Sequence, residues 1–225
     1  PFGVVDLKDG RVAGLEEKPQ TPRSHLINAG IYLFDSDIFA LIDRTPKSPR
    51  GEFEITDTLQ GLIREGSLRG YRLPGEWLDV GRPWDLLRAN AALLKPLKGA
   101  IHGTVDAGAT LDGEVLVEEG AHVRPGSHII GPVIVGRGAE IGPNCYIRPF
   151  TSVGLRVKVG NACEVKNSIL MAETHMPHQT YVGDSVLGER CNLGAGTKVA
   201  NLRLDETNIR VLYRGSEVDT GLRKL

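Results

Sequence analysis

The sequence has 225 residues, 40% of them hydrophobic, and a formal net charge of -1 at pH 7. This near neutrality argues against a nucleic-acid-binding or polybasic membrane surface, and no apolar run approaches the length of a membrane span. The chain is long enough for two modest domains and shows no secretory leader, so we expect a soluble, cytoplasmic protein.

Two short apolar segments at the start of the chain, residues 1–7 and 11–15, flank the pair Asp9-Gly10. An Asp-Gly pair favours the tight turn of a β-hairpin. We therefore expect the chain to begin inside a sheet. Because no strand precedes the hairpin and no methionine begins the chain, we interpret the sequence as part of a longer protein.

The next part of the sequence predicts strands and helices in alternation, at residues 26–34 (strand), 56–65 (helix), 68–73 (strand) and 83–94 (helix). Thr56 or Asp57 suits the N-cap of the first helix, and Pro83 suits the first turn of the second. Pro96 would end that helix. We expect the domain boundary directly after it, giving domains at residues 1–98 and 99–225.

The later part of the chain has a period of six, because an aliphatic residue returns at every sixth position. The first run is Val105, Leu111, Val117, Val123, Ile129, Val135, Ile141, Ile147, Val153, Val159, Val165 and Met171, and a second run in shifted register is Val182, Leu187, Leu193 and Val199. Helices repeat every 3.6 residues and strands every two, whereas a coil with three short flat sides repeats every six. The pattern predicts a three-sided solenoid with about five and a half coils of 18 residues.

A second position of each six-residue unit is small or β-branched, and it includes Cys145, Cys163 and Cys191. We interpret these cysteines as packed side chains rather than metal ligands or disulfide partners. Glycine is frequent just after the aliphatic residue, where we expect a corner that needs an unusual backbone conformation.

Four motifs before the solenoid resemble the C-terminal half of a sugar-1-phosphate nucleotidylyltransferase: E-K-P at residues 17–19, N-A-G-I-Y at 28–32, G-E-F-E-I-T-D at 51–57 and W-L-D-V-G at 77–81. Joined to a hexapeptide solenoid, they are similar to the archaeal-type bifunctional sugar-1-phosphate nucleotidylyltransferase/acetyltransferases. The resemblance implies a partial α/β, Rossmann-like nucleotidyltransferase domain followed by a left-handed parallel β-helix that is incomplete at its C-terminus. The family's Gly-rich nucleotide loop, with its catalytic arginine, and its first metal-binding aspartate have no counterpart in the sequence.

The resemblance also assigns residues to nucleotidyl transfer, in which a sugar-1-phosphate attacks the α-phosphate of a nucleoside triphosphate with the help of Mg²⁺. It implies that Asp79 binds the metal, that Glu17 and Asn28 bind the sugar, and that Lys18 contacts the sugar phosphate. The alternative is that Glu17 and Lys18 form a solvated charge pair and that Asp79 caps a loop. Without the Gly-rich loop, we do not expect this chain to transfer nucleotides by itself.

The six-residue register breaks between Met171 and Val182, and a break in a repeat is a common place for function. Within it lies His178, three residues before Tyr181 and followed by the turn Gly183-Asp184. In the acetyltransferase family, a histidine in this pattern acts at the acyl-transfer site. Transfer from acetyl-CoA to the amine of glucosamine-1-phosphate needs a base near neutral pKa, so we expect His178 to be that base.

Other residues match the family's spacing around this histidine. Arg148 and Lys166 are 18 residues apart, one full coil, so they project from the same face and suit one phosphate. The resemblance implies that Tyr181 and Asn192 bind substrate and that Asn201 orients His178 or the substrate. The alternative is that the histidine is a plain loop residue and the two cations a solvated ladder.

Three hypotheses follow from these patterns. In the first, the chain is an acetyltransferase attached to part of a nucleotidylyltransferase, and it works as a homotrimer with sites between neighbouring prisms, as the resemblance implies. In the second, it belongs to a monofunctional glucose-1-phosphate thymidylyl- or uridylyltransferase whose solenoid only assembles or regulates. In the third, it is a non-catalytic assembly module. The pair His178 and Tyr181 favours the first hypothesis over the second.

Overall fold

The structure is a computed structural model that describes residues 2–199 and 201–225, and it divides into two compact units. The first unit ends at Trp77 and the second begins at Leu78. Helix α3 (Asp85–Leu94) therefore belongs to the second unit, although we expected the domain change after it. The domain limits 98 and 99 remain a prediction. None of the helices in the described residues is both long enough and apolar enough to cross a bilayer.

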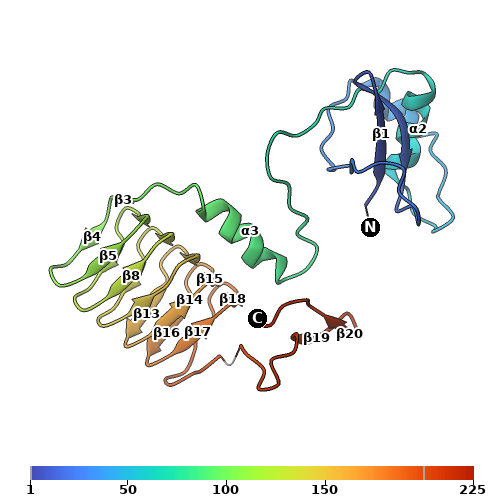
Figure 1. Cartoon of the computed structure of the whole chain (residues 1–225). Coiled ribbons are helices and arrows are strands. Elements are labelled where there is room, and N and C mark those ends of the chain that lie inside the picture. Colours follow the sequence, from blue (N-terminus) through green and yellow to red (C-terminus); the bar gives the residue numbers. More distant parts are fainter. Residues whose placement is uncertain (1, 200) are drawn as a thin grey trace. The chain divides into compact units, whose positions relative to one another are not determined.

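The first unit opens on the expected hairpin, formed by β1 (Val4–Lys8) and β2 (Arg11–Glu16) (Figure 1). Asp9 and Gly10 have φ values of 49° and 76°, the left-handed conformations that a two-residue hairpin turn requires. Two helices follow, α1 (Asp37–Ile42) and α2 (Ile55–Arg64). The expected helix at 56–65 is thus present, but its N-cap is Glu54.

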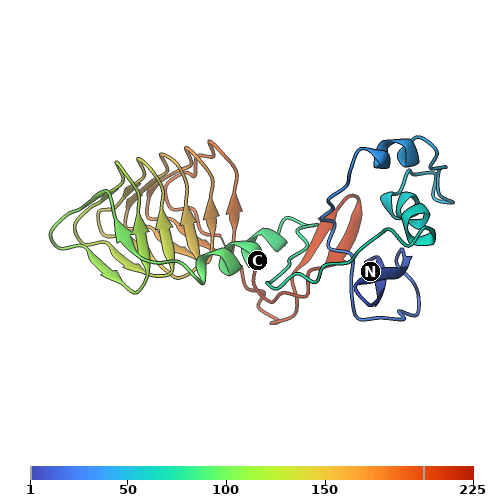
Figure 2. The ribbon, with the colours of Figure 1, turned by 90° about the horizontal axis from the view of Figure 1, so that it is seen from above.

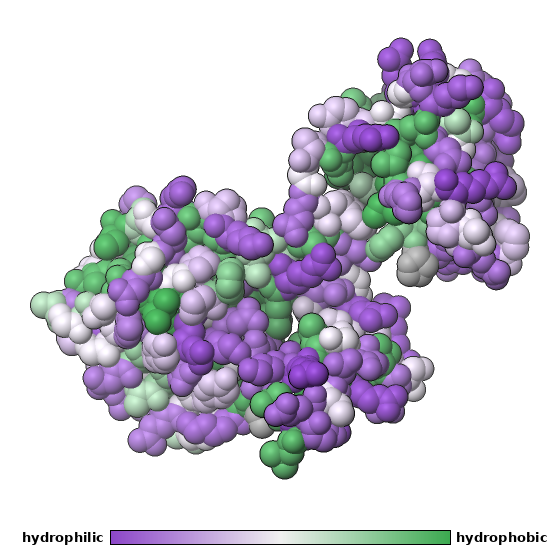
Figure 3. All heavy atoms as spheres, viewed as in Figure 1, coloured by the Kyte–Doolittle hydropathy of each residue, from purple (hydrophilic) through white to green (hydrophobic). Residues whose placement is uncertain are grey.

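The strands expected at residues 26–34 and 68–73 are wrong. Each segment lies along one edge of the hairpin but forms only an isolated bridge, Val4 with Ile27 and Arg11 with Arg69. A strand needs several consecutive ladder partners, and each segment has only one bridge partner in the hairpin. The unit consequently has a small buried core, and Leu33 is 98% exposed. Figure 3 shows apolar residues on the visible face of this unit.

The second unit contains the predicted solenoid, whose strands form three parallel sheets, called here sheets I, II and III. Sheet I contains β4 (Thr104–Val105), β7 (His122–Val123), β10 (Glu140–Ile141), β13 (Lys158–Asn161) and β16 (His175–His178). Sheet II contains β5 (Thr110–Asp112), β8 (His128–Ile130), β11 (Tyr146–Ile147), β14 (Glu164–Lys166) and β17 (Tyr181–Gly183). Sheet III contains β3 (Ala100–Ile101), β6 (Val115–Val117), β9 (Val133–Val135), β12 (Thr151–Val153), β15 (Ile169–Leu170) and β18 (Val186–Leu187).

The coils stack along one axis, each passing once through all three sheets (Figure 2). A separate antiparallel hairpin follows the last coil, formed by β19 (Arg210–Tyr213) and β20 (Ser216–Asp219). Helix α3 packs on sheet III, where Asn90 donates to the carbonyl oxygen of Phe150 at 2.9 Å and its Oδ1 accepts from Ser152 at 2.6 Å.

The interior confirms the repeat through Val165, but the register then changes in a way that we did not expect. Partners on neighbouring coils are 18 residues apart as far as Tyr146 and Glu164, and 17 apart from Ser152 and Ile169 onward. The inward residue after Val165 is consequently Leu170, which is 1% exposed, and not Met171.

The predicted break between residues 171 and 182 is therefore also wrong, because β16 and β17 are regular strands there. The change comes from two sides that are one residue shorter, each ending at a corner occupied by Asn167 or Asp184 with positive φ. After it, hydroxyl residues fill the small inward position. Each hydroxyl donates to a nearby carbonyl, as Ser168 does to Lys166 at 2.7 Å and Thr180 to His178 at 2.9 Å.

The glycines after the aliphatic residues have a different cause from the one expected. Of the set Gly136, Gly142, Gly154, Gly160, Gly183, Gly188 and Gly194, Gly142 alone has positive φ. A Cβ at Gly136, Gly154 or Gly160 would instead lie closer than 3.0 Å to backbone atoms of the next coil. Close stacking of the coils, rather than backbone conformation, requires glycine at these three positions.

The cysteines differ in accessibility, which predicts a difference in reactivity. Cys145 is 2% exposed, and burial raises its pKa to about 11, whereas Cys191 is partly exposed. Only a thiolate reacts readily with an alkylating reagent. We expect iodoacetamide at pH 8 to modify Cys191 in the folded protein and to leave Cys145 unmodified, as measured by peptide mass spectrometry. Both should react in urea, and equal labelling of the two in the folded protein would contradict the burial of Cys145.

Candidate functional site on the solenoid

Sheet II carries several of the predicted site residues on its outer face. Because Val165 and Val182 point into the solenoid, the residues beside them on β14 and β17, Lys166 and Tyr181, point outward. Arg148 follows β11, and its backbone N–H donates to the carbonyl oxygen of Val165 at 2.8 Å. Arg148 and Lys166 thus lie on neighbouring coils at the same edge of sheet II, as their spacing predicted.

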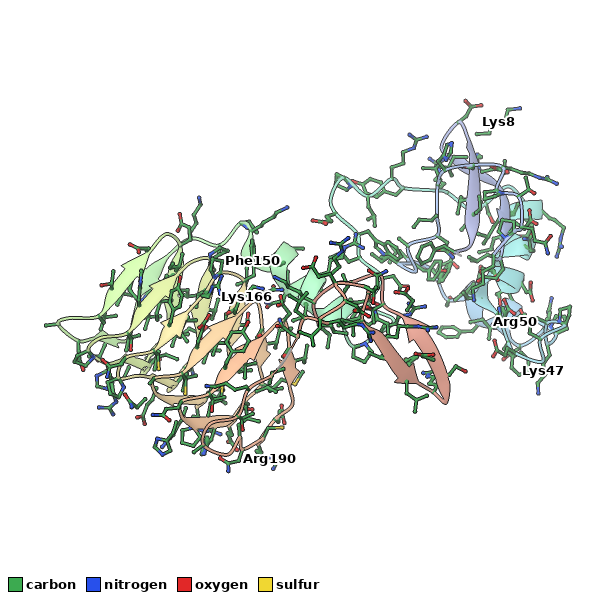
Figure 4. All side chains as sticks on the ribbon, turned by 60° about the horizontal axis from the view of Figure 1, so that its bottom comes forward. Lys8, Lys47, Arg50, Phe150, Lys166 and Arg190 are labelled. Atoms are coloured by element: carbon green, nitrogen blue, oxygen red, sulfur yellow. The ribbon has the colours of Figure 1, made fainter. Side chains whose placement is uncertain are left out.

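Each of these two cations has a carboxylate partner. Arg148 Nη1 lies 3.0 Å from Glu164 Oε1, and its guanidinium lies over the ring of Tyr146 at 5.7 Å. Lys166 Nζ lies 2.9 Å from Asp184 Oδ2. Figure 4 labels Lys166 and, one coil earlier at the same edge, Phe150. Neither carboxylate was among the site residues expected from the sequence.

Asp184 gathers further polar groups at the end of β17. Its carboxylate accepts from the side-chain amides of Asn167 and Asn201, and the hydroxyl of Tyr181 lies beside Gly183 close to the Asn201 amide. We call Lys166, Tyr181, Asp184 and Asn201 the sheet II cluster. A signal for Asp184 was present in the sequence, because it follows Lys166 by 18 residues, one unshortened coil.

His178 lies apart from this cluster, at the end of β16 in sheet I. Its side chain is exposed, and its carbonyl oxygen accepts from the backbone N–H of Gly196 at 3.1 Å. Within the described residues, no hydrogen bond or ion pair joins its imidazole to the sheet II cluster. Gly183, the residue that pairs with Lys166, is five positions after His178. The extended backbone from His178 to Gly183 therefore spans at most roughly 16 Å.

Asn192 lies on the side of His178 rather than beside the sheet II cluster. It is exposed and pairs with His175, which places it next to sheet I. Within one chain, Arg148 therefore lies at the edge of sheet II that carries the cluster, whereas His178 and Asn192 lie at sheet I.

Three of the predicted nucleotidyltransferase residues lie close together in the first unit. Glu17 and Lys18 form an ion pair at 3.6 Å. A Cβ on Gly3 would lie 3.0 Å from Glu17 Oε2 and 3.5 Å from Asn28 Cβ, so both side chains border this glycine. Asn28 also donates to the hydroxyl of Tyr32 at 2.6 Å and lines a mostly apolar cavity of about 630 Å³.

The expected metal ligand is Asp79. Asp79 is exposed and belongs to the second compact unit. Among the described residues, no three His, Cys, Asp or Glu side chains come together as a metal site requires. Mg²⁺ remains an expectation from the resemblance.

Comparison with known proteins places both parts of the chain. The family "Nucleotidyl transferase" matches residues 1–96, and the family "GMPPB C-terminal domain" matches residues 129–220. A solved hexapeptide transferase family protein from Anaplasma phagocytophilum covers 44% of this chain and 69% of its own, with 19% identity and a TM-score of 0.28.

Two archaeal relatives match the chain from end to end. The "Bifunctional protein GlmU" of Methanocaldococcus jannaschii is 48% identical over 225 residues, which is 100% of this chain and 55% of that protein. The "Bifunctional sugar-1-phosphate nucleotidylyltransferase/acetyltransferase" of Sulfurisphaera tokodaii is 41% identical over 226 residues, 100% of this chain and 56% of that protein. The chain thus spans about half the length of the curated relatives that it matches.

Proposed function

Because the chain is related along its whole length to the bifunctional sugar-1-phosphate nucleotidylyltransferase/acetyltransferases of archaea, we propose that its solenoid transfers an acetyl group from acetyl-CoA to glucosamine-1-phosphate. The observation that carries the proposal is the sheet II cluster, in which three residues at the family's spacing meet on one outer face. The product would serve nucleotide-sugar biosynthesis.

The proposed chemistry assigns a role to each residue. The sugar amine attacks the thioester carbonyl of acetyl-CoA, a C–N bond forms, the C–S bond breaks, and the leaving thiolate takes up a proton. His178 accepts the proton that the amine loses, because its imidazole is exposed to solvent and histidine is the most frequent general base in enzymes. Arg148 and Lys166 bind the sugar phosphate, while Tyr181 binds the sugar.

Glucosamine-1-phosphate carries its amine on C2 and its phosphate on C1, which are adjacent ring carbons, so the base and the phosphate-binding cations must approach the same end of the substrate. The long side chain of Lys166 can span part of the backbone distance toward His178. We propose that the chain forms a homotrimer in which a neighbouring chain's Asn192 completes the site, while Asn201 stays in the cluster of its own chain.

For the first unit, we propose that Glu17 and Asn28 bind the sugar and that Lys18 contacts its phosphate. Their approach around Gly3 supports this proposal. In a protein of the relatives' length, the sugar phosphate would attack the α-phosphorus of a nucleoside triphosphate and pyrophosphate would leave. Asp79 is the proposed ligand of the Mg²⁺ that such a reaction uses.

The acetyl-transfer proposal predicts a specific substrate requirement. A protein of the relatives' length that carries this sequence should release free CoA thiol from acetyl-CoA when glucosamine-1-phosphate is added, as measured with a thiol reagent, and mass spectrometry should find the N-acetylated sugar phosphate. Glucose-1-phosphate has the same phosphate but no amine, so it should release no thiol above the blank. Equal release with both sugars would contradict amine acetylation.

The same assay separates the competing functions. A protein that forms nucleotide sugars but releases no thiol would be a monofunctional nucleotidylyltransferase, and one that does neither would be an assembly module. The monofunctional alternative is less supported, because the relatives that match the whole chain carry bifunctional names.

A further inference from the structure

Asp184 carries a buried negative charge that the proposed chemistry does not use. The residue is 6% exposed, and its two carboxylate oxygens accept from three side chains. Oδ2 accepts from Lys166 Nζ at 2.9 Å and from the Asn201 amide, while Oδ1 accepts from Asn167 Nδ2 at 2.7 Å. A buried carboxylate is costly unless it is paired and hydrogen-bonded, so these three donors and the carboxylate hold one another in place.

The backbone fixes the direction of this carboxylate. Asp184 has a φ of 51° at the corner that ends β17, and its N–H donates to the carbonyl oxygen of Lys166 at 2.9 Å. Asn167 occupies the equivalent corner of the preceding coil with a φ of 44°. Asp and Asn tolerate this left-handed conformation better than most residues. The shortened side therefore stacks Asp184 over Asn167 and turns it toward Lys166.

Gly183 keeps the outer face clear beside this carboxylate. A Cβ at this position would lie 2.5 Å from the hydroxyl oxygen of Tyr181 and 2.9 Å from Asn201 Nδ2. The phenol and the amide thus meet over the glycine, next to the Lys166 ammonium. Lys166, Tyr181 and Asn201, which come from separate coils, consequently lie together beside Asp184.

We propose that Asp184 is a positioning residue for acetyl transfer, which fixes the Lys166 ammonium and the Asn201 amide toward the sugar phosphate. This inference depends on the acetyltransferase function proposed above. A lysine side chain loses considerable conformational entropy when it is held in one position. Because the fixed Asp184 carboxylate already holds Lys166 before the substrate binds, binding of the substrate does not have to offset this loss. Asp184 does not itself touch the reacting atoms. It acts on binding of the sugar phosphate and not on binding of acetyl-CoA.

The test is a kinetic comparison of Asp184→Asn with the unchanged protein of the relatives' length. Asparagine keeps the shape and one acceptor oxygen but removes the charge that holds Lys166. We expect the KM for glucosamine-1-phosphate to rise about tenfold, the scale of a charge-assisted hydrogen bond, with the KM for acetyl-CoA changed less than about twofold. Asp184→Glu, which restores the charge, should recover part of the lost affinity.

A matched control is Glu140→Gln. Glu140 is also a solenoid carboxylate with two cationic partners, Arg124 at 3.1 Å and Lys158 at 3.7 Å, but it lies on sheet I two coils away from Asp184. Its removal should leave both KM values unchanged. A second check is the Lys166→Met background, in which Asp184→Asn should raise the KM for the sugar phosphate less than about twofold further, because its partner is gone.

The outcomes distinguish the two proposals. If the unchanged protein transfers no acetyl group, the proposed function fails. If it is active and Asp184→Asn lowers only the melting temperature, or raises both KM values equally, then Asp184 is a structural residue and this inference fails. If the effect of Asp184→Asn persists in full in the Lys166→Met background, positioning of Lys166 is refuted.

Discussion

Replacing His178 by alanine should lower the rate of acetyl transfer at least roughly a hundredfold, the usual contribution of a general base. The amine of glucosamine-1-phosphate must lose a proton as it attacks the thioester, and His178 is an exposed imidazole at the end of β16 in sheet I. The measurement is thiol release from acetyl-CoA by a protein of the relatives' length, with kcat and both KM values determined.

A neighbouring histidine provides the control for this variant. His175 is the first residue of the same strand, whereas His178 is the last; His175 is also exposed and pairs with Asn192. His175→Ala should retain most of the rate. A rate for His178→Ala equal to that of the unchanged protein would remove His178 as the base.

The same variant also tests whether neighbouring chains share a site. If His178 comes from one chain and Asn192 from the next, the inactive variants His178→Ala and Asn192→Ala should regain part of the activity when they are unfolded together and refolded as mixed trimers. Each variant refolded alone should stay inactive. No recovery in mixed trimers would place both residues in a site formed by one chain.

Replacing Gly160 by alanine should destabilise the solenoid by about 3 kcal/mol or more, and it should also reduce acetyl transfer. A Cβ at this position would lie closer than 3.0 Å to the carbonyl group and Cα of Pro177 on the next coil. Backbone atoms cannot rotate away as a flexible side chain can, so the coils must separate. Pro177 directly precedes His178 on β16, and the displacement would therefore move the proposed base.

Gly194→Ala is the matched control, because a Cβ there meets no atom within 4 Å and its φ is not positive. We expect its unfolding free energy to stay within about 0.5 kcal/mol of the unchanged protein. Thermal and urea unfolding would measure both variants. Equal stability of the two would show that the coils do not stack as closely at Gly160 as the structure indicates.

The sequence predicted the solenoid well because its interior repeats. A position that faces inward on every side must be aliphatic, so residues such as Ile129 and Ile147 appear in strict order and are fully buried. The turn at Asp9-Gly10 was equally predictable, because two left-handed residues in succession demand this pair. The strand at residues 26–34 was not predictable, because this apolar segment forms only one isolated bridge beside β1.

The candidate site was predicted only in part. The spacing of Arg148 and Lys166 placed them on neighbouring coils, because one coil has a known number of residues. The shortening of two sides by one residue could not be read from the six-residue pattern, since Leu170 and Met171 are both apolar and either satisfies it. Because either residue fits the pattern, the sequence suggested a loop around His178, where the structure has the regular strand β16.

By itself, the sequence determined the two-part organisation and the three-sided coil, because periodicity and motif order are properties of the chain alone; the residues assigned to the chemistry remain a prediction. The tertiary structure alone decided that Asp184 gathers Lys166 and Asn201, that Arg148 is paired with Glu164, and that Gly160 is required by the coil above it. These contacts join residues one coil apart, and a shift of one residue changes which of them meet.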